Sequence, residues 1–153
     1  MEIDIPTWAI SLLVAFVGIL GAFAVHRFGA FRAASVKFRA AVLDALTGLY
    51  PTPVGWPDNS NAVDHMLTAA FPALQKAVAE FREALPGRKR KAFDSAWLAY
   101  RAGPDGASTN QQGRHYQYMG YHEAGTSDAS GRAKSKELFH ANVRRLLSFA
   151  NET

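Results

Sequence analysis

The sequence predicts an all-α protein with a single N-terminal transmembrane helix, followed by a small helical bundle of about four helices with a long loop containing Gly, Ser and Tyr. Three observations predict this fold class. An uncharged apolar run occupies 8–25. Beyond it, apolar residues recur every three to four positions, which is the amphipathic helical period. Clusters of Pro and Gly separate the helical segments. We therefore divide the chain into an anchor, 1–28, and a helical domain, 29–153.

The apolar run has the length and composition of a membrane span. Its eighteen residues contain no ionisable side chain, and as a helix they extend roughly 27 Å, close to the roughly 30 Å of bilayer hydrocarbon. Ten of them are Ile, Leu, Val or Phe, each contributing about −0.3 to −0.6 kcal/mol to insertion near the centre. The residues predicted to lie in the membrane include Trp8, Leu12, Val14, Phe16, Gly18, Leu20, Ala22 and Val25.

Two alternatives to a retained span stay open, a cleaved export signal and a buried core helix. The stretch 22–24, Ala-Phe-Ala, resembles a cleavage site, but Glu2 and Asp4 precede the run where a signal peptide carries basic residues. A core helix of a soluble domain normally shows a polar stripe, and this run has none. These features favour the retained span.

The charges that flank the run predict its orientation. Arg27, Arg32, Lys37 and Arg39 follow it before the next acidic residue, Asp44. The positive-inside rule then places the N-terminus outside and the C-terminal domain in the cytoplasm, as a single-pass protein of a bacterial inner membrane. The lipid bilayer is thus the first predicted partner.

A stripe of small residues inside the run suggests a second contact. Ser11, Ala15, Gly18 and Ala22 follow one another at spacings of four, three and four. Small side chains on one helix face let two membrane helices approach closely, so self-association through the span is one prediction. A stripe that merely faces lipid is the alternative.

The first two helices of the domain follow from apolar spacing. Apolar residues recur from Phe38 to Leu49, and only Gly29 separates this helix from the span, so we expect that the two can form one long helix. Asn59 or Ser60 can cap the next helix, in which Pro72 predicts a kink or an interruption. This helix carries a seam that we expect to face sister helices of an antiparallel bundle: Leu67, Phe71, Leu74, Val78, Phe81 and Leu85.

Two more helices complete the predicted bundle. Pro86 and Gly87 form a turn, after which 88–102 places Phe93, Trp97 and Tyr100 on one side. A loop rich in Gly, Ser, Asn and Gln spans about 103–131. The last helix, 130–150, offers these residues to the core: Phe139, Val143, Leu146, Leu147 and Ala150.

The stretch 113–125, GRHYQYMGYHEAG, is the candidate for chemistry. Its His115, His122 and Glu123 could bind a metal, with His65 or His140 completing a composite site, although the spacing follows no familiar zinc pattern. We favour an aromatic lid that packs onto the bundle. Four residues are predicted as contacts for a protein partner: Tyr116, Tyr118, Tyr121 and Trp97.

A basic cluster, 88–91, begins the third helix of the domain. Positive charge at a helix N-terminus opposes the macrodipole, so an external partner deserves consideration. Basic residues near an anionic leaflet gain about 1 kcal/mol each. A solvated surface is the alternative. The residues predicted to contact anionic lipid headgroups are Arg27, Arg32, Arg88, Lys89, Arg90 and Lys91.

Composition and motifs narrow the function classes. The chain of 153 residues has no cysteine, which excludes disulfides, thiolate metal sites and a cysteine nucleophile. The net charge of +4 suits anionic surroundings, but we predict no nucleic-acid partner because no recognised binding fold is evident. Phosphate-binding loops, Rossmann fingerprints and nucleophile elbows are missing from the sequence. We predict no catalytic residue and no cofactor.

Three stretches, KFRAAVLDALTGLYPTPVGWP, AFDSAWLAYRAG and NVRRLLSFA, resemble an uncharacterised family of small bacterial single-span membrane proteins with a helical cytoplasmic domain. The resemblance covers most of the chain and implies an inner-membrane setting. Because its motifs are aromatic and aliphatic, it implies no activity and no functional residue.

These observations together predict a membrane-anchored interaction or scaffolding module for an unknown protein partner. The predicted contact surfaces are the seam from Leu67 to Leu85, the face with Trp97 and Tyr100, and the loop 113–125. The alternatives are sensing of anionic lipid through the basic cluster and a metal-dependent activity of the loop histidines.

Overall fold

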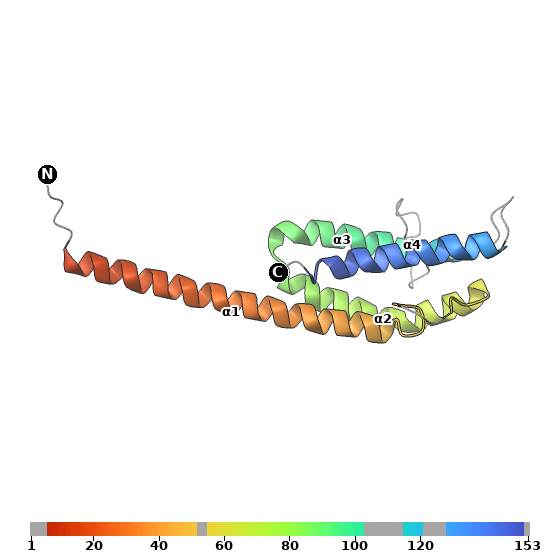
Figure 1. Ribbon diagram of the computed structural model, residues 1–153, viewed down its shortest axis with the longest axis horizontal. Coiled ribbons are helices and arrows are strands. Elements are labelled where there is room, and N and C mark those ends of the chain that lie inside the picture. The colour runs from red at the N-terminus through yellow and green to blue at the C-terminus, as the bar shows by residue number, and fades with distance from the viewer. Residues whose placement is uncertain (1–5, 52–54, 103–114, 121–127, 152–153) are drawn as a thin grey trace.

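The structure, a computed structural model, describes residues 6–51, 55–102, 115–120 and 128–151. In these ranges it contains no strand, so the all-α prediction is confirmed. The elements are α1 (Thr7–Ala45), α2 (Ser60–Ala84), α3 (Gly87–Ala102), the single-turn 3₁₀ helix η1 (Tyr116–Tyr118) and α4 (Asp128–Ser148). Figure 1 shows that the N-terminal half of α1 projects beyond the bundle that its C-terminal half forms with the other three helices.

The two halves of α1 have different surroundings because they have different residue patterns. In the C-terminal half, Phe38 and Val42 are buried against the bundle, and Leu46, which caps the helix, is buried at the same four-residue spacing. In the N-terminal half apolar side chains are exposed, for example Phe16 at 61% and Val25 at 73%. The helix continues through Gly29 without a break, so the prediction of one long helix is confirmed.

α1 carries the one candidate membrane span among the described residues. It is long and apolar enough to cross a bilayer, and none of its apolar window is buried inside the protein. A core helix would be buried, so that alternative is wrong. An export signal near the N-terminus meets the same criteria of length and composition. The choice between a retained span and a cleaved signal therefore stays a prediction.

The chain reverses direction between α1 and α2. Gly48 adopts a φ of 95°, a conformation that L side chains rarely adopt, and a Cβ there would lie 3.1 Å from Cε of Met66. The Ala62 amide then donates a hydrogen bond of 2.7 Å to Oδ1 of Asn59, which confirms the predicted cap. Pro72 lies inside α2, which continues to Ala84, so the predicted interruption does not occur.

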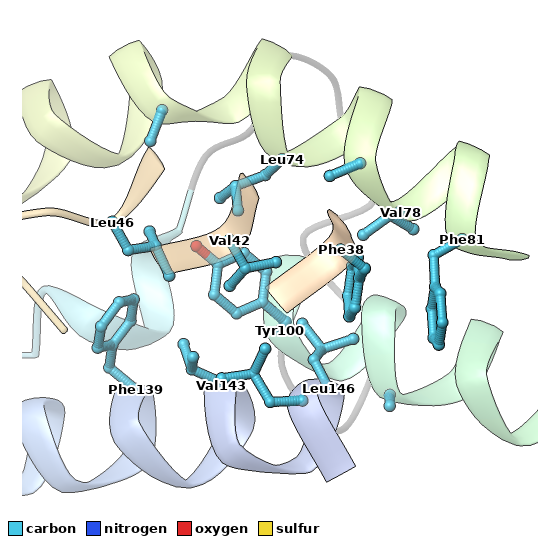
Figure 2. Packing of buried hydrophobic residues seen from close by; sticks show 14 of the residues in the cluster. Phe38, Val42, Leu46, Leu74, Val78, Phe81, Tyr100, Phe139, Val143 and Leu146 are labelled. Atoms are coloured by element: carbon cyan, nitrogen blue, oxygen red, sulfur yellow. The ribbon is translucent and has the colours of Figure 1, made fainter. Parts of the chain in front are cut away.

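The bundle core is a layer of aromatic and aliphatic side chains from all four helices (Figure 2). At its end nearest the projecting half of α1, Phe38 stacks on Phe81 with ring centroids 4.4 Å apart. Phe93 packs edge-on to both rings, at 5.8 and 5.5 Å. Aromatic pairs of this geometry contribute beyond their buried area.

The seam on α2 is part of this core. Its members are buried except for Phe71, which is half-buried, so the prediction that the seam faces sister helices is confirmed. The same burial makes the seam unavailable to another protein, and its predicted role as a contact surface is wrong.

α3 packs on α4, and both bury the residues predicted from their spacing, among them Phe93, Tyr100, Phe139 and Val143. α4 begins at Asp128, earlier than the predicted loop end at 131. The remainder of the predicted loop, 103–114 and 121–127, lies outside the described residues.

Candidate functional site

A groove lies where α1 leaves the bundle. It runs between α1 and the turn that joins α2 to α3, and its volume is about 460 Å³. Figure 1 shows this turn beside α1, at the end of the bundle from which the N-terminal half projects. We call it the juxtamembrane groove, after the predicted span in α1. Its lining residues are Phe23, Arg27, Phe28, Phe31, Ala84, Pro86, Arg88 and Lys89.

Basic residues that are far apart in the sequence line the same groove. Arg27 follows the apolar run on α1, whereas Arg88 and Lys89 begin α3. None of the lining residues in the described ranges is acidic. Two other predicted lipid contacts, Arg32 and Lys91, are exposed and do not line it.

Arg90 has a different role from the predicted one. Its Nε donates to the carbonyl oxygen of Leu85 at 3.1 Å, and its Nη2 donates to that of Glu83 at 2.9 Å. These carbonyls lie at the C-terminus of α2, where a cation satisfies unpaired acceptors and complements the macrodipole. Arg90, a member of the basic cluster, thus stabilises the fold by joining α3 to the end of α2.

A second link holds the same two helices. Arg82 on α2 donates to the Asp94 carboxylate on α3 at 2.7 and 3.0 Å. The hydrogen bonds from Arg82 lower the pKa of Asp94, and those to Asp94 raise the pKa of Arg82. Together with Arg90, this pair fixes the turn that forms one wall of the juxtamembrane groove.

The residues predicted to lie in the membrane are exposed along α1, as a surface in contact with lipid requires: Trp8, Leu12, Val14, Phe16, Gly18, Leu20, Ala22 and Val25. Of the small-residue stripe, Ala15, Gly18 and Ala22 are exposed, whereas the side chain of Ser11 lies outside the described part of the chain. Self-association through this face stays a prediction.

Tyr118 is inside the protein. Its hydroxyl donates to the carbonyl oxygen of Tyr100 at 2.9 Å and accepts from Nδ2 of Asn142 at 2.9 Å. Nε2 of Gln117 also donates to the Tyr100 carbonyl, at 2.6 Å. Tyr118 is 0% exposed and packs against the C-terminus of α3, so its side chain is not presented to a protein partner here. This packing agrees with the favoured aromatic lid at this one residue, and the lid as a whole stays a prediction.

The remaining predicted contacts for a protein partner are Trp97, Tyr116 and Tyr121. Trp97 is half-buried and stacks on Tyr100, with ring centroids 5.4 Å apart. Because Tyr100 is buried, only the exposed part of Trp97 remains of the predicted contact surface on this helix. The Tyr116 side chain and all of Tyr121 lie outside the described residues, and their role stays a prediction.

His115 occupies the centre of a buried aromatic cluster. It is 0% exposed, and its ring packs edge-on to Tyr100 at 5.2 Å. Burial lowers the pKa of His115 to about 4, and burial raises the pKa values of Tyr100 and Tyr118. At neutral pH the cluster is therefore uncharged, which suits packing rather than acid–base chemistry.

The histidines do not assemble a metal site in the described part of the chain. No group of three His, Asp or Glu residues lies close enough there to hold a metal ion. His65 is exposed on α2, and His140 packs against Tyr50 at 5.2 Å. His122 and Glu123 lie outside the described ranges.

The buried imidazole predicts a loss of stability in acid. An unfolded chain binds a proton at His115 with a pKa near 6.5, whereas the folded chain does so only at about 4. Between these values the unfolded state holds more protons, so the stabilisation is complete above about pH 6.5 and is lost as the pH falls toward 4. We expect His115 to account for a loss of about 3 kcal/mol over that interval.

Urea unfolding in neutral detergent at pH 7.5 and 4.5 checks this expectation. His115→Phe should show a smaller difference between the two pH values than the wild type, and the exposed-site control His65→Gln should behave like the wild type. An unchanged pH dependence in His115→Phe would contradict the prediction.

The groove aromatics were missed by sequence reasoning. Phe23, Phe28 and Phe31 alternate with Arg27 and Arg32 at the end of the apolar run, which is the one signal that could have marked them. Their opposite wall, the α2–α3 turn, is brought there by tertiary packing and has no signature in the local sequence.

The chain matches no family model, no curated protein and no solved structure in comparisons with known proteins. The resemblance to small bacterial single-span proteins therefore stays a prediction. The juxtamembrane groove and the buried aromatic cluster are the features of the described residues from which a function can be inferred.

Proposed function

We propose that this protein is a membrane-anchored helical module. The N-terminal half of α1 spans the inner membrane with its N-terminus outside, and the cytoplasmic bundle serves as a tethered interaction or scaffolding unit. One observation carries the proposal: a single continuous helix, Thr7–Ala45, is exposed and apolar in one half and buried in the bundle in the other.

The helix sets the distance between the bundle and the bilayer. Phe31, the first residue of α1 that packs against the core, follows Val25 by six residues, or about 9 Å of helix. The headgroup region of a bilayer is roughly 5–8 Å thick on each side. The bundle would thus sit directly against the membrane surface, without a flexible linker.

The basic flank supports the proposed orientation. Arg27 and Arg32 are exposed on the bundle side of the apolar half, and cytoplasmic flanks carry an excess of such residues. The resemblance to single-span bacterial proteins agrees with this arrangement.

The partner surface is narrower than the sequence predicts, because the α2 seam and Tyr100 are buried. Among the described residues of the bundle, the exposed large apolar side chains are Val36, Leu98 and Leu138. Leu98 follows the half-buried Trp97 on α3, and this pair is the contact that we propose for a protein partner.

The absence of cysteine from the chain permits a clean topology test. Single-cysteine variants at the exposed positions Pro6 and Ala141 are expected to react differently with a membrane-impermeant maleimide. In intact spheroplasts Pro6→Cys should be labelled, and Ala141→Cys should be labelled only after permeabilisation. Labelling of Ala141→Cys in intact spheroplasts would overturn the orientation.

The same background tests the interaction. Leu98→Cys and Ala141→Cys, each carrying a bifunctional maleimide cross-linker on native membranes, form a matched pair. A defined cross-linked species at Leu98→Cys but not at Ala141→Cys supports a partner at this face. Identical patterns at both positions would remove the face from the proposal.

A further inference from the structure

The juxtamembrane groove combines two kinds of wall. Phe23 and Phe28 contribute exposed aromatic rings, at 59% and 73%, and Ala84 and Pro86 face them from the α2–α3 turn. The rings are large apolar surfaces, which are unfavourable in water. This part of the groove suits a hydrocarbon chain.

The same groove gathers positive charge. Arg27 and Arg88 line it, and no lining residue among those that the structure describes is acidic. Like charges brought to one site repel one another unless an anion neutralises them. Both are arginines, whose planar guanidinium groups bind phosphate with paired hydrogen bonds.

The place of the groove along α1 matches the depth of a lipid headgroup. Phe23 belongs to the uncharged apolar run, and Arg27 is the first cation after it. Four residues separate them, which is about 6 Å of helix. Phe23 and Arg27 thus follow one another in the order of acyl chain and phosphate in a leaflet, whereas Phe28 and Phe31 lie beyond Arg27, toward the bundle.

We propose that the juxtamembrane groove binds one anionic phospholipid of the surrounding leaflet. Its phosphate contacts Arg27 and Arg88, and one acyl chain lies along Phe23. A free phosphate would leave the Phe23 ring in water, which is why the occupant is a lipid. The proposal rests on the span of the proposed function, and it adds a specific ligand to the bilayer contact.

Brominated-lipid quenching in the full chain tests the proposal. A bimane label on Ala30→Cys reports on the groove rim, since Ala30 is exposed between Phe28 and Phe31. A label on Ile19→Cys, in the apolar half, reports on bulk lipid. Each variant is reconstituted in phosphatidylcholine vesicles that contain an equal small fraction of brominated phosphatidylglycerol or of brominated phosphatidylcholine.

At Ala30→Cys we expect brominated phosphatidylglycerol to bind at least fivefold better than brominated phosphatidylcholine. Arg27→Gln or Arg88→Gln should each reduce that preference about fivefold, the ordinary effect of one cation near an anionic lipid. Lys91→Gln is the matched control, because Lys91 is exposed in the same basic cluster but does not line the groove. It should keep most of the preference.

The outcomes separate the two proposals. If both lipids quench the Ile19 label equally and the Ala30 label shows no preference, the span stands and the lipid site is wrong. If neither lipid quenches the Ile19 label, the span itself is wrong. If Lys91→Gln and Arg88→Gln act alike, the effect is a diffuse surface charge, which overturns the site.

A final arm distinguishes lipid from free anion. Inorganic phosphate, added at constant ionic strength, should leave the preference at Ala30→Cys unchanged. Loss of the preference would mean that the two arginines bind any phosphate, and the lipid assignment would be wrong. Helical circular dichroism of each variant confirms that the bundle is folded.

Discussion

Replacement of Phe81 by Ala is expected to lower the free energy of unfolding of the bundle by about 3–5 kcal/mol, the usual cost of emptying a buried phenylalanine site. Phe81 is 1% exposed and joins three elements, because its ring stacks on Phe38 of α1 and meets Phe93 of α3 edge-on. Its removal opens a cavity between helices that the surrounding aromatic rings cannot fill.

Phe28→Ala provides a matched control for this change. Phe28 is 73% exposed, so its truncation removes the same atoms without leaving a core cavity. We expect the free energy of unfolding to change by less than about 0.5 kcal/mol in neutral detergent. Urea denaturation followed by circular dichroism measures both variants. Equal losses for the two substitutions would contradict the packing shown in Figure 2.

The double substitution Val17→Asp and Leu20→Asp is expected to release the protein from membranes. Each aspartate near the centre of a span costs about 2.5–3.5 kcal/mol, so the pair costs about 5–7 kcal/mol. The ten large apolar residues of the run together provide roughly −3 to −6 kcal/mol. The change therefore removes the whole driving force for insertion.

Carbonate extraction of membranes gives the readout, with the protein moving from pellet to supernatant. The control Val17→Leu and Leu20→Ile keeps the apolar character and should leave the protein in the pellet. Wild-type protein that is already extracted by carbonate would show that α1 does not span the bilayer.

The helices were predictable from the sequence because their core residues recur at helical spacing. Examples in which one buried face dominates the pattern are Phe38 and Val42 of α1 with its cap residue Leu46, and the seam on α2. Asn59 was predictable as a cap because its side chain acts on an amide three residues away. Such features need only local information.

Features that depend on contacts between distant segments were not predictable. Arg90 was expected to face lipid, yet it binds the carbonyls at the end of α2, since the turn at Pro86 folds α3 back against that end. Tyr118 was predicted both within an aromatic lid and as a partner contact, and its hydrogen bond to the Tyr100 carbonyl eighteen residues earlier was not foreseen. The juxtamembrane groove needs both walls at once, and neither segment alone reveals it.

α1 runs unbroken from its apolar half into the core. It therefore sets both the position of the bundle along the helix axis and the direction in which each side of the bundle faces around that axis. A helix turns by about 100° and rises 1.5 Å with each residue. One residue inserted near Gly29 would swing every bundle surface by more than a quarter turn around the helix axis while lifting it hardly at all. In the proposed membrane-anchored arrangement, a neighbour in the same bilayer thus meets one particular side of the bundle. The number of residues between Val25 and Phe31 determines which side that is.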